Sequence, residues 1–109
     1  MQIDRGKGVA MAVIVEFVVP GATPNQMLEV EGLTRARGEA AGRPPYTGCM
    51  FLAVTSIASG YRVLSAWRTD ADFYAVLETM MGPDLAIVGL AVTDIQVSAV
   101  VSMAIPGAL

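Results

Sequence analysis

One carboxylate stands inside an apolar stretch and could act as a base. Glu16 is the only charged residue between Val9 and Val19, where its neighbours are Val, Ile, Ala, Met and Phe. A buried carboxylate without a positive partner has a raised pKa and becomes a usable general base. Such a base could ionise a phenol, and the electron-rich anion could then react with oxygen. The alternatives are an ion pair with Arg62 or Arg68 on a neighbouring strand, or exposure at a sheet edge.

Aromatic side chains in the second half of the chain could bind a flat substrate. Trp67 ends a predicted strand, and Phe73 and Tyr74 follow in a predicted helix, so the three rings could form a wall. Tyr61 begins the same strand on the same alternating face as Trp67, and Asn25 stands in the first turn of an earlier helix. These five residues are the candidate substrate-binding residues. Core packing or another structural role is the alternative for Trp67, Tyr61 and Asn25, and Phe73 favours the core. The alternative for Tyr74 is a surface position.

The residue types that are missing exclude several chemistries. The chain has no histidine, which removes Ser-His-Asp and Cys-His catalysis, histidine-ligated zinc and a histidine-held haem iron. A lone cysteine, Cys49, excludes an internal disulfide and multi-cysteine metal sites, and it fits a reducing cytoplasm. It stands in an apolar run with no basic neighbour, which favours a buried, inert thiol. We therefore expect neither metal nor cofactor, and a cytoplasmic location.

Charge and hydropathy also bear on partners. The formal net charge is −3 and no basic stripe is present, so we expect no nucleic-acid binding. The apolar run Val9–Val19 is shorter than the roughly 20 residues that cross a bilayer, so we expect no membrane span. Its β-branched residues and its glutamate favour a strand over a signal peptide. At 109 residues we expect one domain over residues 9–109, preceded by a flexible segment over residues 1–8.

The first half of the chain predicts a strand and then a helix. Residues 9–19 are apolar on both alternating faces, and Pro20-Gly21 ends the strand. Thr23, Pro24 and Gln26 carry the signature of a helix start, and Gly42 with two prolines ends that helix. Its inward stripe is predicted to be Met27, Val30, Leu33, and Thr34 or Arg37.

The second half predicts a hairpin, a helix and a strand. Residues 47–58 and 61–67 are β-like runs around a Ser59-Gly60 turn. Thr69 caps the next helix, which Gly82-Pro83 is predicted to break, with a short helical turn over residues 84–88. The last strand, residues 93–103, alternates between apolar and polar side chains.

Strand, helix, strand, strand, helix, strand is the ferredoxin-like order, an α+β fold with an antiparallel sheet and helices on one face. Hydrophobic residues make up 54% of the chain and charged ones 16%. One small domain cannot bury so much apolar surface, and the helix-free sheet face needs a cover. We therefore expect a homodimer packed sheet to sheet, with Arg62 and Arg68 neutralising Glu16 or Asp94 across the interface.

From Tyr61 the chain reads Y-R-V-L-S-A-W-R-T-D-A-D-F-Y-A-V-L, which resembles the dimeric α/β-barrel superfamily, in particular its antibiotic-biosynthesis-monooxygenase-like branch. The opening V-I-V-E-F-V-V-P-G-A-T and the later M-G-P-D-L add to the resemblance, which spans most of residues 11–103. It implies a dimeric barrel with a pocket between helices and sheet, and it places Trp67 in that pocket. Members of this superfamily oxidise polycyclic phenols without a cofactor, degrade haem, or isomerise or decarboxylate small rings.

Two positions depart from the haem-degrading pattern. Val76 stands nine residues after Trp67, where that branch has a histidine, and Ile14 and Glu16 occupy the positions of its asparagine. Haem degradation is therefore rejected. The sequence favours a dimer that binds a small apolar or aromatic molecule, with cofactor-free monooxygenation at Glu16 as the most specific hypothesis. A non-catalytic ligand-binding or structural dimer, or an isomerase or decarboxylase, is the alternative.

Overall fold

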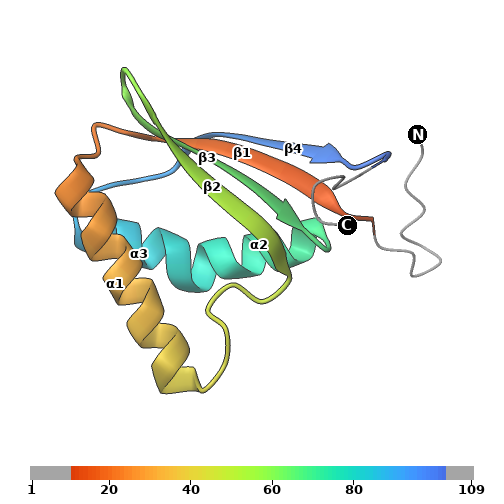
Figure 1. The fold of residues 1–109 in the computed structure, drawn as a ribbon, viewed down its shortest axis with the longest axis horizontal. Coiled ribbons are helices and arrows are strands. Elements are labelled where there is room, and N and C mark those ends of the chain that lie inside the picture. The colour runs from red at the N-terminus through yellow and green to blue at the C-terminus, as the bar shows by residue number, and fades with distance from the viewer. Residues whose placement is uncertain (1–10, 103–109) are drawn as a thin grey trace, which may run out of the picture.

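The computed structural model describes residues 11–102, which form one sheet with helices on one of its faces (Figure 1). The strands are antiparallel in the order β2-β3-β1-β4. This order confirms the predicted α+β, ferredoxin-like fold. The elements are β1 (Val13–Pro20), α1 (Pro24–Ala41), β2 (Cys49–Ile57), β3 (Gly60–Trp67), α2 (Asp70–Val76), the π-helical segment η2 (Leu77–Met81), α3 (Gly82–Ile87) and β4 (Thr93–Ala99).

Strand β1 alternates strictly between the two faces of the sheet. Val13, Val15, Phe17 and Val19 are buried under the helices, while the residues between them, including Glu16, face the opposite side. We call the helix-free side the outer face. The strand begins at Val13, later than the predicted start, and residues 9 and 10 lie outside the described part of the chain, as do the segment 1–8 and Met103.

Helix α1 is capped as its sequence predicts. Thr23 Oγ1 accepts from the Gln26 amide at 3.2 Å, and Gln26 Oε1 accepts from the Thr23 amide at 2.9 Å. At the other end Gly42 takes the left-handed conformation, with φ of 67°, that closes a helix. Only Val30, Thr34 and Gly38 are buried along α1, a stripe narrower than predicted.

This narrow stripe packs on the other helical segments, α3 and η2. Figure 1 shows α1 leaning away from the sheet toward its C-terminal end. The connection from α1 to β2 then returns the chain to the sheet edge. Because α1 does not lie flat on the strands, space remains between it and β2.

The predicted break at Gly82-Pro83 is wrong. Helical backbone continues through α2, η2 and α3, and the wider π turn of η2 lets Pro83 follow without interrupting it. Pro83 is the second residue of α3, which follows the π turn directly. The amide of Gly82 donates to the Leu77 carbonyl, five residues back, and a Cβ at residue 82 would lie 2.8 Å from that oxygen. Glycine and the π turn together therefore accommodate the proline.

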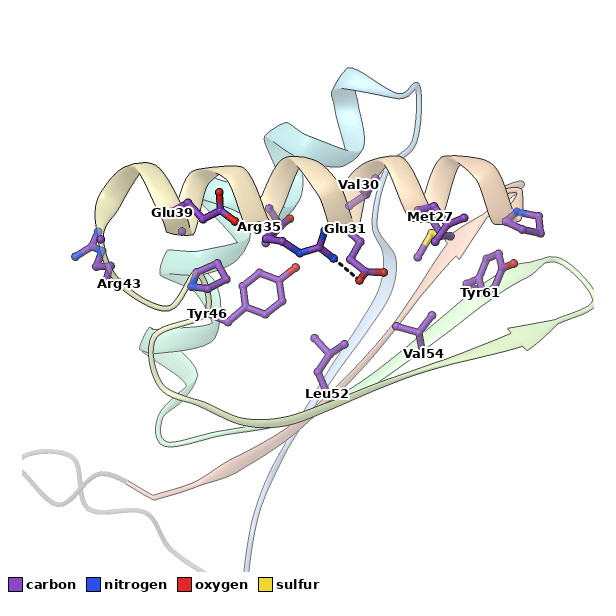
Figure 2. Close-up of a pocket in the computed structure, with 16 residues that line it drawn as sticks. Met27, Val30, Glu31, Arg35, Glu39, Arg43, Tyr46, Leu52, Val54 and Tyr61 are labelled. Atoms are coloured by element: carbon purple, nitrogen blue, oxygen red, sulfur yellow. Dashed lines mark hydrogen bonds and ion pairs between the residues drawn. The ribbon is translucent and has the colours of Figure 1, made fainter.

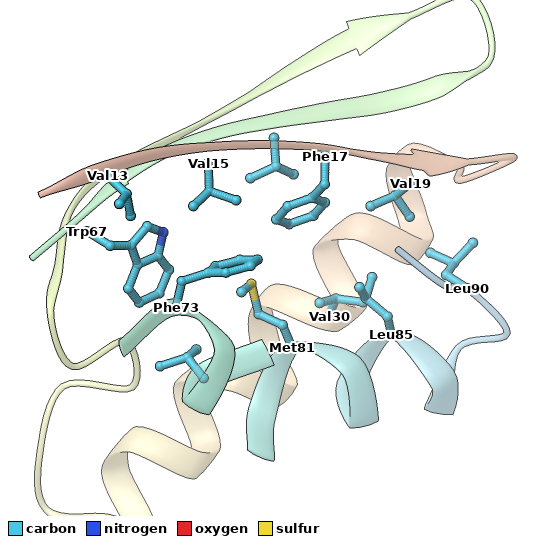
Figure 3. Packing of buried hydrophobic residues seen from close by; sticks show 12 residues of the cluster. Val13, Val15, Phe17, Val19, Val30, Trp67, Phe73, Met81, Leu85 and Leu90 are labelled. Atoms are coloured by element: carbon cyan, nitrogen blue, oxygen red, sulfur yellow. The ribbon is translucent and has the colours of Figure 1, made fainter. Parts of the chain in front are cut away.

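Aromatic rings form the centre of the core (Figure 3). The Trp67 and Phe73 ring centroids are 5.6 Å apart in an edge-on arrangement, and Phe17 lies 6.2 Å from Phe73. The Trp67 indole N–H donates to Ser65 Oγ at 2.8 Å, and Ser65 Oγ donates to the Val15 carbonyl at 3.3 Å. The polar atoms of the core are thus satisfied locally.

Candidate ligand-binding groove

A groove of about 1050 Å³ lies between α1 and the β2–β3 hairpin (Figure 2). Its sheet wall is apolar and carries Leu52 and Val54 of β2 and Tyr61 of β3. The helix wall carries apolar side chains near the start of α1 and charged ones farther along it. The lining residues of α1 include Met27, Leu28, Val30, Glu31, Thr34, Arg35, Gly38 and Glu39.

Gly38 allows the loop after α1 to close one end of the groove. A Cβ at this position would lie 3.0 Å from Pro45 Cδ and 3.1 Å from the Arg43 carbonyl oxygen, both tighter than ordinary contact. The close approach of the loop brings Tyr46 under α1, where its ring packs 6.2 Å from Trp67. In Figure 2 the Tyr46 hydroxyl points into the space between α1 and β2.

Behind the groove, a buried carboxylate ties α1 to α3. Asp84 has no exposed surface, and its Oδ2 accepts from Thr34 Oγ1 at 3.0 Å while its Oδ1 accepts from Arg37 Nε at 2.6 Å. Both donors come from α1, 47 and 50 residues away in the chain. Charge-assisted hydrogen bonds of this kind are about twice as strong as neutral ones, so the pair fixes α1 against α3.

Tyr46 stands near this network and lines the groove. Its phenol lies near Thr34 and Asp84, and both act on its ionisation. Burial raises the pKa of Tyr46 above its ordinary value; the negative charge of Asp84 adds to the shift, and burial outweighs the opposing effect of Thr34. The hydroxyl is therefore a neutral phenol throughout the physiological pH range.

Charged residues line the mouth of the groove. Arg35 Nη2 and Glu31 Oε1 pair at 2.8 Å, one helical turn apart, and both side chains are 63% exposed. Such a pair is worth only about 0.3–0.5 kcal/mol, so a ligand can displace it at little cost. Arg35 is thus available to an acidic group of a ligand that enters this side.

Of the predicted substrate-binding residues, Tyr61 lies in the groove wall. Trp67 and Phe73 have no exposed surface and belong to the core behind the groove. Tyr74 is exposed and stacks edge-on against Phe73 with centroids 5.0 Å apart. Asn25 is exposed in the first turn of α1 and does not line the groove. The structure therefore does not bring these five residues together around one cavity.

Glu16 lies on the outer face of the sheet, away from the groove. Its Oε1 pairs with Arg62 Nε at 3.1 Å, and the two side chains are 40% and 48% exposed. This is the ion pair that the sequence offered as the alternative to a base, formed between neighbouring strands of one chain. A base at Glu16 would act on the outer face and would not reach a ligand in the groove.

Sequence reasoning missed the group formed by Tyr46, Thr34, Asp84 and Arg37. Tyr46 stands in a loop with no periodicity, and Asp84 follows a proline, where an acid usually caps a helix and meets water. One signal was present: Thr34 and Arg37 fall on the inward side of α1, where polar residues require buried partners. Their partner could not be found from local spacing.

Cys49 is half-buried at the start of β2. Burial raises the pKa of its thiol and outweighs a lowering contribution from the Phe51 backbone. The Sγ–H donates to the Phe51 carbonyl at 3.2 Å. The neutral thiol is thus favoured, which makes Cys49 a weak nucleophile.

Residues 11–102 contain no group of three or more His, Cys, Asp or Glu side chains placed to hold a metal ion. In the same part of the chain, no helix combines the length and apolar character needed to cross a membrane.

No protein-family model matches the chain, and no curated protein matches it significantly. Among solved structures, a conserved protein from Methanosarcina mazei Go1 aligns with 84% of this chain and 92% of its own, at 11% identity and a TM-score of 0.49. A candidate antibiotic biosynthesis monooxygenase from Deinococcus radiodurans aligns with 87% of this chain and 95% of its own, at 14% identity and a TM-score of 0.44. Its description names the branch that residues 61–77 resemble. Neither similarity bears on the activity of this chain, and the fold rests on the observed strand order.

Two arginines on α1 test the importance of the buried carboxylate. Arg37→Met leaves Asp84 with Thr34 as its remaining side-chain donor, so we expect the free energy of unfolding to fall by about 2–4 kcal/mol. Arg35→Met removes an exposed pair, and the loss should stay below about 0.5 kcal/mol. Urea unfolding followed by circular dichroism measures both. Equal losses in the two variants would contradict a special role for Asp84.

Proposed function

We propose that this protein binds a small apolar, aromatic molecule in the groove between α1 and the β2–β3 hairpin. The observation that carries the proposal is the groove itself, at about 1050 Å³, with an apolar sheet wall and one neutral phenol at its inner end. Ligand sites commonly measure about 300–1,000 Å³ and combine apolar walls with a few polar groups that orient the ligand. A ring system of two or three fused rings fits this description.

The walls favour a ligand that is mostly uncharged. Leu52 and Val54 face α1 and bury apolar surface when a ring lies between them and the helix, at roughly 25 cal/mol per Å². Val54 is 45% exposed, so part of that surface is available to a ligand. The charged residues stand near the mouth and can interact with a polar substituent.

Filling the groove tests this proposal. We expect Val54→Trp to occupy the space and to weaken binding of 1-naphthol at least tenfold, because a ring can no longer lie against β2. The matched control is Ala86→Trp, an exposed position on α3 that does not line the groove. Isothermal titration measures both affinities. Unchanged binding in Val54→Trp, or no binding by the unmodified protein, would overturn the proposed site.

The most specific reaction we propose on this scaffold is oxidation of a bound phenol by molecular oxygen without a cofactor. For 1-naphthol the balance is one substrate and one O₂ giving one naphthoquinone and one water, with all four electrons supplied by the substrate. In this proposal the ring lies against Leu52 and Val54, and its oxygen substituent lies near Tyr46. Isomerisation or decarboxylation in the same groove, and binding without turnover, are the alternatives.

Oxygen consumption separates these alternatives. With 1-naphthol under air, we expect uptake above the background rate and a quinone absorbance, both reduced at least tenfold in Val54→Trp and unchanged in Glu16→Gln, since Glu16 lies on the outer face. Product formation under nitrogen would instead indicate isomerase or decarboxylase chemistry. Binding without oxygen uptake would leave a ligand-binding protein.

We further propose that the outer face packs against the same face of a second copy. This face carries one neutralised ion pair beside apolar side chains: Phe51 is 46% exposed, and Ile14 and Leu64 flank Glu16 and Arg62 along the strands. Gln96, Ser98 and Thr55, opposite Glu16, Ile14 and Arg62, make the rest of it polar. Because Glu16 and Arg62 neutralise each other within the chain, self-association does not bring like charges together. Large apolar patches left uncovered on a small domain favour association.

A charge on the outer face tests the dimer. We expect Phe51→Glu to convert the protein to a monomer at micromolar concentration, because a carboxylate would be buried without a partner. Ile87→Glu is the control, since Ile87 is 62% exposed but belongs to the helical layer. Light scattering coupled to size exclusion reports the mass. A monomeric unmodified protein, or a dimer that persists in Phe51→Glu, would contradict this interface.

A further inference from the structure

A smaller cavity of about 60 Å³ lies at the bottom of the groove, between the sheet, α1 and the helical segments η2 and α3. We call it the inner chamber. Some side chains border both spaces, so the groove and the chamber adjoin each other. These shared side chains are Met27, Val30, Tyr46, Leu52 and Val54. A ligand that lies in the groove therefore lies against the chamber.

The sheet side of the chamber leads from the groove into the core. Val54 of β2, Val63 of β3 and Phe17 of β1 are paired neighbours in the sheet and line the chamber from its helix side. Their exposed fractions fall along this row from 45% to 4% and 2%. Met81 and Leu85 line the chamber from the helical layer, toward which Phe17 points (Figure 3). The chamber thus adjoins the groove at one end and ends in the core at the other.

The lining of the chamber favours an apolar occupant. Of the described residues that border it, Tyr46 alone has a polar side chain. A buried water typically makes about three hydrogen bonds, so water is a poor occupant of such a space. An apolar group gains contacts with the side chains around it and is removed from solvent at the same time.

The size of the chamber limits what can enter. One water needs roughly 10–15 Å³ of cavity volume, and an apolar cavity of about 150 Å³ binds benzene. At about 60 Å³ the chamber is too small for a ring and large enough for a short alkyl group. We infer that it holds an alkyl substituent of the ligand, of roughly one to three carbon atoms, so that the groove selects aromatic molecules carrying such a branch. The inference rests on the ligand binding proposed above.

Alkyl naphthols test the chamber from the ligand side. Because Tyr46 borders both spaces, we place the branch on the carbon next to the hydroxyl. Isothermal titration under nitrogen, which prevents oxidation, compares 1-naphthol with its 2-methyl, 2-ethyl and 4-ethyl derivatives. Each buried carbon should tighten binding about fourfold, so the 2-ethyl compound should bind roughly tenfold more tightly than 1-naphthol. The 4-ethyl isomer carries its branch across the ring and should lack this advantage.

Protein variants locate the branch. Leu85→Phe places a larger side chain in the chamber and leaves the groove lining unchanged, so the advantage of 2-ethyl-1-naphthol over 1-naphthol should disappear. Val63→Ile adds a single carbon and should reduce this advantage about fourfold. Leu90→Phe is the matched control, because Leu90 is buried in the same core but lines neither cavity. It should retain the full advantage, and 1-naphthol should still bind all three variants.

The outcomes distinguish this inference from the proposed function. If 1-naphthol binds but the 2-ethyl compound binds no more tightly than its 4-ethyl isomer, the chamber is not a substituent site and the groove remains a ligand site. An advantage that persists in Leu85→Phe and Val63→Ile, or that Leu90→Phe loses equally, also overturns the inference. Val63→Ile decides the matter if Leu85→Phe does not fold. If no naphthol binds the unmodified protein, both proposals fall.

Discussion

The carboxylate of Asp84 is enclosed between α1 and α3 and takes both of its side-chain donors from α1. A charge without access to water is tolerated only with close, well-directed partners, so α1 must stay where Thr34 and Arg37 can reach it. That position holds the helix against α3 and off the sheet. The groove between α1 and β2 therefore results from the need of the buried Asp84 carboxylate for donors on α1, as well as from apolar packing.

Tyr46 connects the aromatic core to the groove. Tyr46 packs its ring toward Trp67 and also lines the groove. One residue thus belongs to both the aromatic core and the open space under α1. With no histidine in the chain, Tyr46 and Arg35 are among the polar groups that can orient a ligand there, with Tyr61 and the glutamates of α1.

The two faces of the sheet carry different roles because strand side chains alternate. The helix side of β1 holds Val15 and Phe17 in the core, and the outer side presents Glu16, which pairs with Arg62. Because Glu16 lies on the outer face, its carboxylate cannot act on a ligand in the groove. It contributes instead to the charge of the proposed dimer surface. The groove and that surface are then separated by the sheet and can be altered independently.

Much of the fold followed from local sequence. The Thr23 capping box, the left-handed Gly42 and the hairpin between β2 and β3 are encoded by residues within a few positions of one another, and the element order then leaves few topologies. The hairpin turn lies at Ala58-Ser59, one position before the predicted Ser59-Gly60, since Ile57 pairs with Gly60. The helix through Gly82-Pro83 escaped prediction because a π turn, which local propensity does not specify, accommodates the proline. Tyr61 was placed on the helix side of β3 by simple alternation, and it lies in the groove wall.

The sequence by itself therefore determined the elements, their caps and the alternation of each strand, since these depend on short-range sterics and hydrogen bonding. It also determined which chemistries are absent, because residue types can be counted. Tertiary structure alone decided that Asp84 meets Thr34 and Arg37 across about 50 positions, that Trp67 belongs to the core, and that Glu16 faces away from the groove. These outcomes depend on how far one helix stands from the sheet, a distance set by side chains far apart in the chain.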